Sequence, residues 1–583
     1  MMKFYKLLAP LLAALAVVCF IAFIIHFSTG IPQADDYPMM FKFLDRWMAS
    51  GSFQEKYMLL TEQFLDHRMV AMKLTVLSVK ALHGKMDINI VNAVGVVIWF
   101  GTLMIVYKAF TRSKLPLISF LPVLFFTLHP GFGFDGLLWA ATWMAFPWAI
   151  FLTLASFYFL VFHPSRTGLI VAWLFAFFAL FSHGNGIFAF LIGMAILLFE
   201  RKKQRTLLWL GFSCLAFLLF FFNYKSGGTS ENSPVENLLH YPLYVLSSMG
   251  AFAGGSFYFP DLEVTVLSSK NLPAIVFGWI LCVAILGYCV YLLWNLFKSS
   301  DPIDTHLPEN RLLLFCSAIG IFIVGTAAMI SAVRTHSYLL HGFAARYHFY
   351  SALLISVVYI MALLSFEKLR SLRFSLIAVS ISFFYCAGQY WYQTDGLANH
   401  VRVYQAGLYN SKTIGQWILY IDARFWERGV NAYSNEMLWT KKSKNFTFPA
   451  VKLDTANPVK VLHKSDLPKE YSLQVNDGED AFFVHAKGEL FQLPAFGNIT
   501  DGSYLNLVSP TQSILYPLNP EREGFRQFMT NATYYKPEAN LVLRKKWLPS
   551  GLYKMYLFVI RDGRKTKVDM ETTIFVKKYP LEI

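Results

Sequence analysis

The sequence is poor in charged residues. Only 15% of its 583 residues are Asp, Glu, Lys or Arg, whereas soluble domains usually contain roughly 25%. Hydrophobic residues make up 56% of the chain, and 56 residues are phenylalanine. This composition excludes an ordinary soluble domain and indicates a membrane protein with many apolar helices.

Cysteine is also scarce, and it is absent after residue 386. All six cysteines lie inside long apolar runs: Cys19, Cys214, Cys282, Cys289, Cys316 and Cys386. The C-terminal part of the chain therefore has neither a disulfide framework nor a cysteine-based metal site.

Long apolar runs occupy the first two thirds of the chain. A bilayer core about 30 Å thick requires roughly 20 apolar residues per helix, so we predict about eleven membrane-spanning helices. These predicted spans are residues 7–27, 88–107, 115–128, 137–162, 168–182, 184–199, 206–222, 274–296, 312–333, 347–364 and 374–391. No comparable run follows, which predicts a membrane domain at residues 1–391.

The predicted spans lack Asp, Glu, Lys and Arg in their interiors. Ion-coupled transporters and proton pumps usually carry such residues near the middle of the membrane. This absence argues against transport, although a lipid-linked sugar flippase or transporter stays open as an alternative.

Lys and Arg gather in loops on one side of the predicted membrane. If the spans alternate, that side holds Lys3, Lys6, Lys108, Arg112, Lys114, Arg166, the stretch RKKQR at 201–205, Lys298, Arg311, Lys368, Arg370 and Arg373. The positive-inside rule assigns these loops and the N-terminus to the cytoplasm. The net charge of +15 then reflects membrane topology, and we expect no nucleic-acid partner.

Two outer segments are apolar without being predicted spans. The first outer loop, residues 28–87, has apolar residues near helical spacing, which predicts two or more amphipathic helices along the membrane interface. The stretch at 237–255 would reverse the side of Lys298 if it crossed the membrane. We therefore expect it to be re-entrant or to lie on the outer surface.

The residue pattern changes twice after residue 391. Residues 392–444 are polar with helical rhythm and predict an amphipathic connector, with Trp417, Tyr420, Ile421, Phe425 and Trp426 on one side. Residues 445–583 alternate between apolar and polar positions, with Asp562-Gly563 as an expected hairpin turn. We predict an extracytoplasmic β-sandwich that either binds a glycan or serves only as a structural lid.

Asp35 and Asp36 lie directly after the first span. Adjacent carboxylates raise one another's pKa, and such a carboxylate can act as a general base. An aspartate at this position can also simply cap a helix or lie in a solvated turn. The sequence does not decide which of the two side chains points inward.

Several cationic and polar residues are expected at the outer ends of the spans. They are His67 and Arg68 within QFLDHRMV, Arg334 after the ninth span, and Arg346, Tyr347 and His348 within HGFAARYHFYSALL. Arg and His at a membrane surface can stabilise a phosphate leaving group. The same residues are also common as contacts to lipid headgroups or as helix anchors.

These three motifs and the overall plan resemble the GT-C superfamily of integral membrane glycosyltransferases, in particular the polytopic bacterial type. The resemblance lies in the acidic pair of the first outer loop, the acidic-His-Arg segment QFLDHRMV, and the Arg-Tyr segment that opens a late helix. It implies a GT-C-like membrane domain followed by an extracytoplasmic domain.

The resemblance also implies an activity. A sugar would move from a polyprenyl-phosphate or polyprenyl-diphosphate carrier to a surface glycan or lipid at the bacterial inner membrane, with membrane lipids as the surroundings. Asp36 or Asp35 would be the catalytic base, and His67, Arg68, Arg346, Tyr347, Arg334 and His348 would bind substrate. A divalent cation such as Mg²⁺ or Mn²⁺ is compatible with the acidic pair. A non-catalytic envelope assembly or sensor protein is a further alternative.

Overall fold

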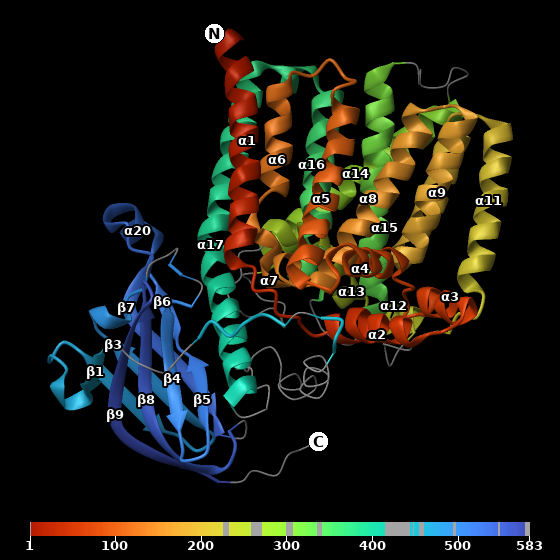
Figure 1. Ribbon diagram of the computed structural model, residues 1–583. Helices are drawn as coiled ribbons and strands as arrows, with labels where there is room; N and C mark the ends of the chain where they lie inside the picture. Colours follow the sequence, from red (N-terminus) through yellow and green to blue (C-terminus); the bar gives the residue numbers. More distant parts are fainter. Residues whose placement is uncertain are drawn as a thin grey trace. The chain divides into compact units, whose positions relative to one another are not determined.

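The computed structural model describes residues 2–225, 233–257, 271–298, 307–334, 341–413, 443–446, 448–453, 460–493, 497–498, 500–545 and 548–577. The chain divides into two compact units (Figure 1). The first unit comprises Met1–Ile25 and Pro38–Gln393, and the second comprises His26–Tyr37 and Thr394–Ile583.

The first unit is a bundle of apolar helices. In the described part of the chain, nine helical stretches are long and apolar enough to cross a membrane. They are Leu8–Phe27 in α1 (Met2–Phe27), α5 (Ile88–Phe110), Leu117–Leu137 with α6 (Leu121–Thr127) and α7 (Gly133–Leu137), α8 (Ala140–Phe162), α11 (Lys203–Phe221), Leu272–Trp294 in α14 (Leu272–Lys298), α15 (Pro308–Arg334), Ala345–Ser365 with α16 (His348–Ser365), and α17 (Leu372–Thr413).

The remaining two predicted spans coincide with shorter apolar helices. These are α9 (Arg166–Ser182) and the stretch Gly184–Phe199, which contains α10 (Ile187–Phe199). At 1.5 Å per residue, a 17-residue helix is about 25 Å long, slightly less than the bilayer core. The prediction of a polytopic helical membrane protein is confirmed, with about nine full-length spans instead of eleven.

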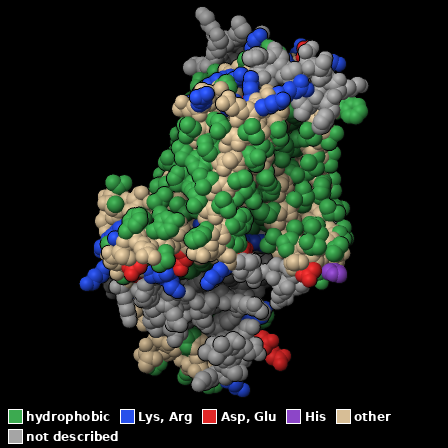
Figure 2. Space-filling model, turned by 90° about the vertical axis from the view of Figure 1, so that its right-hand side faces the viewer, with side chains coloured by type: hydrophobic (Ala, Val, Ile, Leu, Met, Phe, Trp, Pro, Cys, Tyr) green, Lys and Arg blue, Asp and Glu red, His purple; other side chains and the backbone are tan. Residues whose placement is uncertain are grey.

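The bundle exposes a belt of hydrophobic side chains. Figure 2 shows the side on which α11 lies, with hydrophobic side chains covering the middle and charged side chains gathered toward the ends. On α11, Leu207, Leu218 and Phe221 are all more than half exposed. A large exposed apolar surface of this kind is stable only when lipid covers it.

The stretch predicted to be re-entrant or surface-lying forms two short helices, α12 (Pro234–His240) and α13 (Pro242–Gly254). Neither is among the candidate spans. Leu239 in α12 is exposed, whereas the second half of α13 is buried. This half packs tightly on α14, because Cβ atoms at Gly250 and Gly254 would each lie within 3 Å of the α14 backbone. Glycines spaced four apart allow such close helix contact.

The first outer loop is helical. It contains a π-helical turn (Tyr37–Phe41), α2 (Lys42–Ala49), α3 (Phe53–Thr61) and α4 (Val70–His83). Ser52 caps α3 by accepting a hydrogen bond from the Glu55 backbone N–H, and the Glu55 side chain accepts from the Ser52 backbone in return. The expected helices of this loop are therefore present.

The second unit contains two β-sheets. The first has the strand order β1-β9-β8-β4-β5 and the second has the order β2-β3-β7-β6. The strands are β1 (Lys460–His463), β2 (Ser472–Asp477), β3 (Ala481–Lys487), β4 (Gly502–Val508), β5 (Ser513–Pro517), β6 (Asn519–Arg522), β7 (Tyr535–Arg544), β8 (Gly551–Arg561) and β9 (Arg564–Val576), with α20 (Phe525–Asn531) before β7. All neighbouring pairs are antiparallel except β1 and β9, so the first sheet is mixed.

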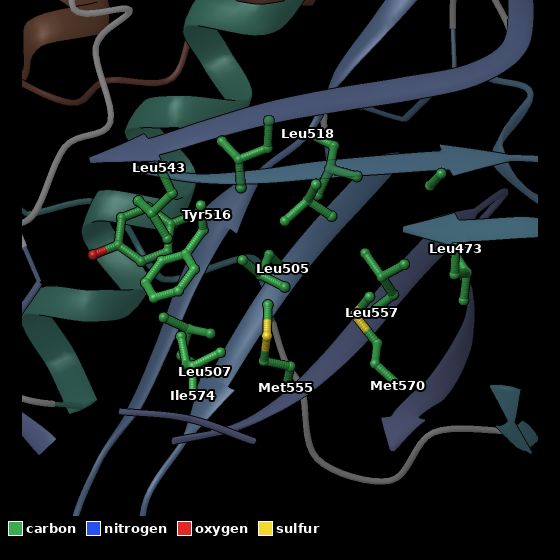
Figure 3. Packing of buried hydrophobic residues seen from close by; sticks show 14 of the residues in the cluster. Leu473, Leu505, Leu507, Tyr516, Leu518, Leu543, Met555, Leu557, Met570 and Ile574 are labelled. Atoms are coloured by element: carbon green, nitrogen blue, oxygen red, sulfur yellow. The ribbon is translucent and has the colours of Figure 1, made fainter. Parts of the chain in front are cut away.

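One hydrophobic core joins the two sheets. Leu473 and Leu543 from the four-stranded sheet and Leu505, Leu557 and Tyr516 from the five-stranded sheet belong to the same buried cluster (Figure 3). Alternate residues of each strand enter this core, as expected for face-to-face sheet packing. The predicted C-terminal β domain is confirmed.

The hairpin prediction is also confirmed. Asp562 and Gly563 both have positive φ, at 50° and 75°, and they connect the paired residues Arg561 and Arg564. Two successive residues of positive φ define a type I′ turn, which favours Asp-Gly. The first part of the predicted connector, residues 392–413, is helical and continues α17. Trp417, Tyr420, Ile421, Phe425 and Trp426 lie outside the described residues.

Candidate functional site

Asp36 lies in a compact turn that follows the first helix. Its side chain is completely buried, whereas Asp35 is partly exposed. The Gln33 backbone N–H donates to Asp36 Oδ2 over 2.8 Å, and the Asp36 backbone N–H donates to the Gln33 carbonyl over 2.8 Å. Gly30 and Ala34 adopt positive φ within this turn. The segment therefore holds the Asp36 carboxylate in a fixed position in the second unit.

Arg68 is buried and connects two segments of the first unit. Its guanidinium donates to the carbonyls of Thr61, Phe220 and Phe222, with Nη1 to Thr61 at 2.6 Å and Nε to Phe220 at 3.0 Å. The rings of Phe181 and Phe220 lie near its charge. These contacts join the end of α3 to the C-terminal end of α11. They give Arg68 a structural role, while its predicted role in substrate binding stays a prediction.

Lys73 has a similar role, which was not predicted from the sequence. It is 5% exposed, and its ammonium donates to the carbonyls of Leu59, Leu60 and Glu62 at 2.6 to 3.1 Å. The last carbonyls of α3 have no partners within the helix, so a cation at this end satisfies them. The lysine within the apolar sequence VAMKLTVL at the start of α4 is the feature from which this structural role could have been predicted.

His67 lies against His183. Their rings stack with centroids 3.9 Å apart and an interplanar angle of 26°. The Gly184 backbone N–H donates to His67 Nδ1 over 3.2 Å, which leaves Nε2 of that ring to carry the proton of the neutral form. Burial, together with the nearby charge of Arg334, lowers the pKa of His67 to about 4. His67 is therefore a neutral donor near pH 7.

A hydrogen-bonded chain continues from His183 into the bundle. Asn185, which is fully buried, donates through Nδ2 to the Tyr350 hydroxyl over 2.8 Å and to Thr326 Oγ1 over 3.4 Å. This orientation leaves Asn185 Oδ1 to accept from His183 Nδ1, at 2.9 Å. The stretch SHGNG at 182–186, which contains the 3-10 turn Gly184–Gly186, thus also orients a histidine.

Arg346 is held by an acidic partner. Its Nη1 lies 3.5 Å from Asp135 Oδ2, and each side chain is 20% exposed. Its guanidinium also lies 6.0 Å from the centre of the Trp139 ring and 5.4 Å from that of Tyr347. This geometry orients the guanidinium while leaving it partly accessible, which is what recognition of an anionic group requires.

The residues that flank Arg346 are anchored. Tyr347 is buried, and its hydroxyl accepts from Arg334 Nη1 over 3.5 Å. His348 donates through Nδ1 to the Gly131 carbonyl over 2.6 Å, and its own carbonyl accepts from Ser256. The structure thus brings Arg334, Tyr347 and Arg346 together. It places Arg68 with α11 instead, and Asp35 and Asp36 in the other unit.

The described residues contain no evident metal site. Among the residues that the structure describes, no group of three or more His, Cys, Asp and Glu side chains could hold a metal ion. A site for Mg²⁺ or Mn²⁺ beside the acidic pair stays a prediction.

Stability should depend on pH through His67. Its pKa is about 4 in the folded protein, against 6.5 for an ordinary histidine, so the unfolded chain binds more protons between these values. The contribution of His67 to the free energy of unfolding is therefore fully present above pH 6.5. It decreases as the pH falls toward 4, and at pH 5 the free energy of unfolding is about 2 kcal/mol lower than at pH 8. Thermal unfolding of the detergent-solubilised protein at pH 8 and pH 5 would measure this loss.

Two variants test that assignment. His67→Gln should reduce the difference between pH 8 and pH 5, because the titrating group is gone. His83→Gln, which replaces an exposed histidine at the end of α4, should leave it unchanged. An equal loss of stability in wild type and His67→Gln would contradict the neutral state of His67.

The fold and these sites define a class: a multi-span helical membrane protein with a C-terminal β domain. A narrower identification does not follow from similarity, because the chain matches no protein-family model, no curated protein and no solved structure.

Proposed function

We propose that the chain is a glycosyltransferase that moves a sugar from a polyprenyl-phosphate carrier to a glycan or lipid acceptor on the outer face of a bacterial inner membrane. The observation that carries the proposal is Asp36, a completely buried carboxylate fixed by a backbone hydrogen bond directly after the first membrane helix. A positioned carboxylate at the end of a span suits general-base chemistry on a lipid-linked substrate.

The proposed reaction is a displacement at the anomeric carbon of the sugar. The acceptor hydroxyl oxygen attacks this carbon while Asp36 takes the hydroxyl proton. The bond from the anomeric carbon to the phosphate oxygen breaks, and the polyprenyl phosphate leaves with the electron pair. Positioning and stabilisation of the developing negative charge supply most of the rate enhancement in such reactions.

Within the first unit, Arg346 is the residue best suited to bind the phosphate of the lipid carrier. It is oriented by Asp135 and remains partly exposed, and Arg334 joins it through Tyr347. His67 can add a neutral N–H donor. Arg68 is less suited to this role, because its guanidinium already donates to three carbonyls.

The distribution of charge favours transfer over ion-coupled transport. Asp135, Arg334 and Arg346 lie at the ends of their candidate spans, and the interiors of the predicted spans contain no Asp, Glu, Lys or Arg. Coupled transporters usually bind ions near the middle of the membrane.

The test is sugar transfer by membranes that contain wild type, Asp36→Asn or Asp35→Asn. A panel of labelled polyprenyl-phosphate hexoses and pentoses serves as donor, and a surface-glycan and lipid extract serves as acceptor. Asparagine keeps an oxygen for the Gln33 N–H but cannot take a proton, so Asp36→Asn should lower transfer at least about 100-fold. Asp35→Asn should stay within a few fold of wild type.

Asp45→Asn is the matched control, because Asp45 is a partly exposed carboxylate of the same loop. All variants must insert at wild-type levels, measured by quantitative blotting of membranes. Undiminished transfer by both Asp36→Asn and Asp35→Asn would show that the acidic pair only shapes the turn.

A further inference from the structure

Helix α17 continues from its predicted membrane span into the second unit. The predicted span, residues 374–391, is followed without a break by further helix to Thr413, and the residues from Thr394 onward belong to the second unit. At 1.5 Å per residue, Asp395 lies about 6 Å beyond the end of that span. The headgroup layer on each side of a bilayer core is roughly 5–8 Å deep, so the predicted span places this turn of α17 among the lipid headgroups.

The β domain contacts α17 at both ends of this second-unit segment. At its start, the Tyr534 side chain is hydrogen-bonded to the Asp395 backbone, and the charge of Arg522 acts on the Asp395 carboxylate. At its end, Thr413 donates to the Ser513 carbonyl over 3.0 Å. These two ends of the segment are about 27 Å apart along the helix. Arg522 and Tyr534 therefore mark the end of the β domain that is near the predicted span, and Ser513 marks the far end.

Helix α20 is built on the near end of the β domain. It lies between Arg522 and Tyr534 in the sequence, and Figure 1 shows it at one end of β6 and β7. The Glu523 backbone N–H donates to the Tyr534 carbonyl over 2.9 Å and closes the base of the α20 segment. The rings of Phe528 and Tyr534 are in contact, with centroids 6.2 Å apart. These contacts fix α20 beside the residues that contact Asp395.

Helix α20 exposes two large apolar side chains and an arginine. Phe525 is 60% exposed and Met529 is 67% exposed, and their spacing of four residues places them on the same helix face. Arg526, next to Phe525, is also exposed. Apolar side chains gain free energy when they leave water. A helix with exposed apolar residues and a neighbouring arginine suits the boundary between lipid headgroups and acyl chains, where the guanidinium meets phosphate groups.

We propose that α20 binds the surface of the lipid bilayer, with Phe525 and Met529 below the headgroups and Arg526 on the headgroup phosphates. Lipid is the partner because α20 is attached to the turn of α17 that directly follows a membrane span. The helix is then a second membrane attachment of the β domain, in addition to α17, and it limits rotation of the domain about the α17 axis. This role does not depend on the proposed transferase activity.

Leu552 and Phe575 provide a matched comparison within the same domain. They are 60% and 65% exposed and lie directly opposite one another on β8 and β9. Lys554, two residues from Leu552, is in register with Val508 on β4, and Val508 is in register with Ser513 on β5. This apolar pair therefore lies at the far end of the β domain, where we expect no lipid.

The test is photolabelling of the full chain by lipid. The protein is reconstituted into vesicles of phosphatidylethanolamine and phosphatidylglycerol, and some of the phosphatidylglycerol carries a diazirine on its acyl chain close to the headgroup. Mass spectrometry of proteolytic peptides then measures the lipid attached to each segment, with α11 as the internal reference for a membrane span. In wild type, peptides from α20 should carry at least about fivefold more label than peptides with Leu552 or Phe575, because only α20 reaches the bilayer.

Two double variants complete the test. Phe525→Ser/Met529→Ser should reduce the label on α20 at least about fivefold, because it removes the apolar area that enters the lipid. Leu552→Ser/Phe575→Ser should leave that label unchanged. All four side chains are exposed, so both variants should fold, and α11 should be labelled as in wild type. The proposal is overturned if α20 carries no more label than the Leu552 and Phe575 peptides, which would point to a protein partner, or if Phe525→Ser/Met529→Ser leaves the α20 label unchanged.

Discussion

Arg68→Met should destabilise the first unit by about 3–5 kcal/mol. The change leaves the carbonyls of Thr61, Phe220 and Phe222 without the donor that they have now, and each buried unpaired carbonyl costs about 1–3 kcal/mol. Contacts between the loop helix α3 and the end of α11 would weaken together. The amount of folded protein in membranes and its melting temperature in detergent measure this effect.

Arg46→Met is the control for Arg68. Arg46 pairs with Glu62 at the surface, where both side chains are nearly half exposed, so its loss should cost less than about 1 kcal/mol. If Arg68→Met inserts and melts like wild type but raises the KM for a lipid-linked sugar, Arg68 binds substrate as the sequence predicted, and its structural role is wrong.

Gly254→Leu should have an effect of similar size, because α13 and α14 cannot stay in contact. A Cβ atom at Gly254 would overlap the Ala274 carbonyl oxygen and lie 3.0 Å from the Gly278 nitrogen, and both are backbone atoms. Only a separation of the two helices relieves this clash, so the cost should be about 3 kcal/mol, the upper end of the usual range for overpacking. Protease sensitivity and melting temperature of the purified protein would show the change.

Gly287→Leu tests whether any large residue on α14 is harmful. Gly287 is an exposed glycine of the same helix, and no atom lies within 4 Å of the position that a Cβ atom would take there. Leucine also forms helices better than glycine by roughly 0.5–1 kcal/mol. Gly287→Leu should therefore be neutral or stabilising, and equal damage from both variants would contradict the close packing of α13 on α14.

The features predicted correctly from the sequence depend on local patterns. A membrane span needs only a long apolar run, so all eleven predicted runs coincide with helices, nine of them of full length. The turn at Asp562-Gly563 needs only two residues that tolerate positive φ. In contrast, the sequence does not show that the helical start of the connector, residues 392–413, continues α17 and is held by distant partners, such as Asn410 with Leu515.

The residues of the candidate site were likewise predicted only from local patterns, without their distant partners. The sequence indicates which polar residues lie near the ends of spans, including Arg346 and His67, but not how they are paired. Arg68 and its partner Phe220 are 152 residues apart, and His67 stacks on a histidine of the stretch SHGNG. Such pairings depend on the packing of the bundle, which a single sequence does not specify.

The central claim is that a glycosidic bond forms, and the fate of the label tests it most directly. Sealed proteoliposomes with wild type or Asp36→Asn would receive a labelled polyprenyl-phosphate sugar and an acceptor extract. We predict that with wild type the label leaves the lipid and appears on the acceptor, and that with Asp36→Asn it stays on the lipid. Label that remains lipid-linked with wild type but changes leaflet would contradict the claim and identify a flippase instead.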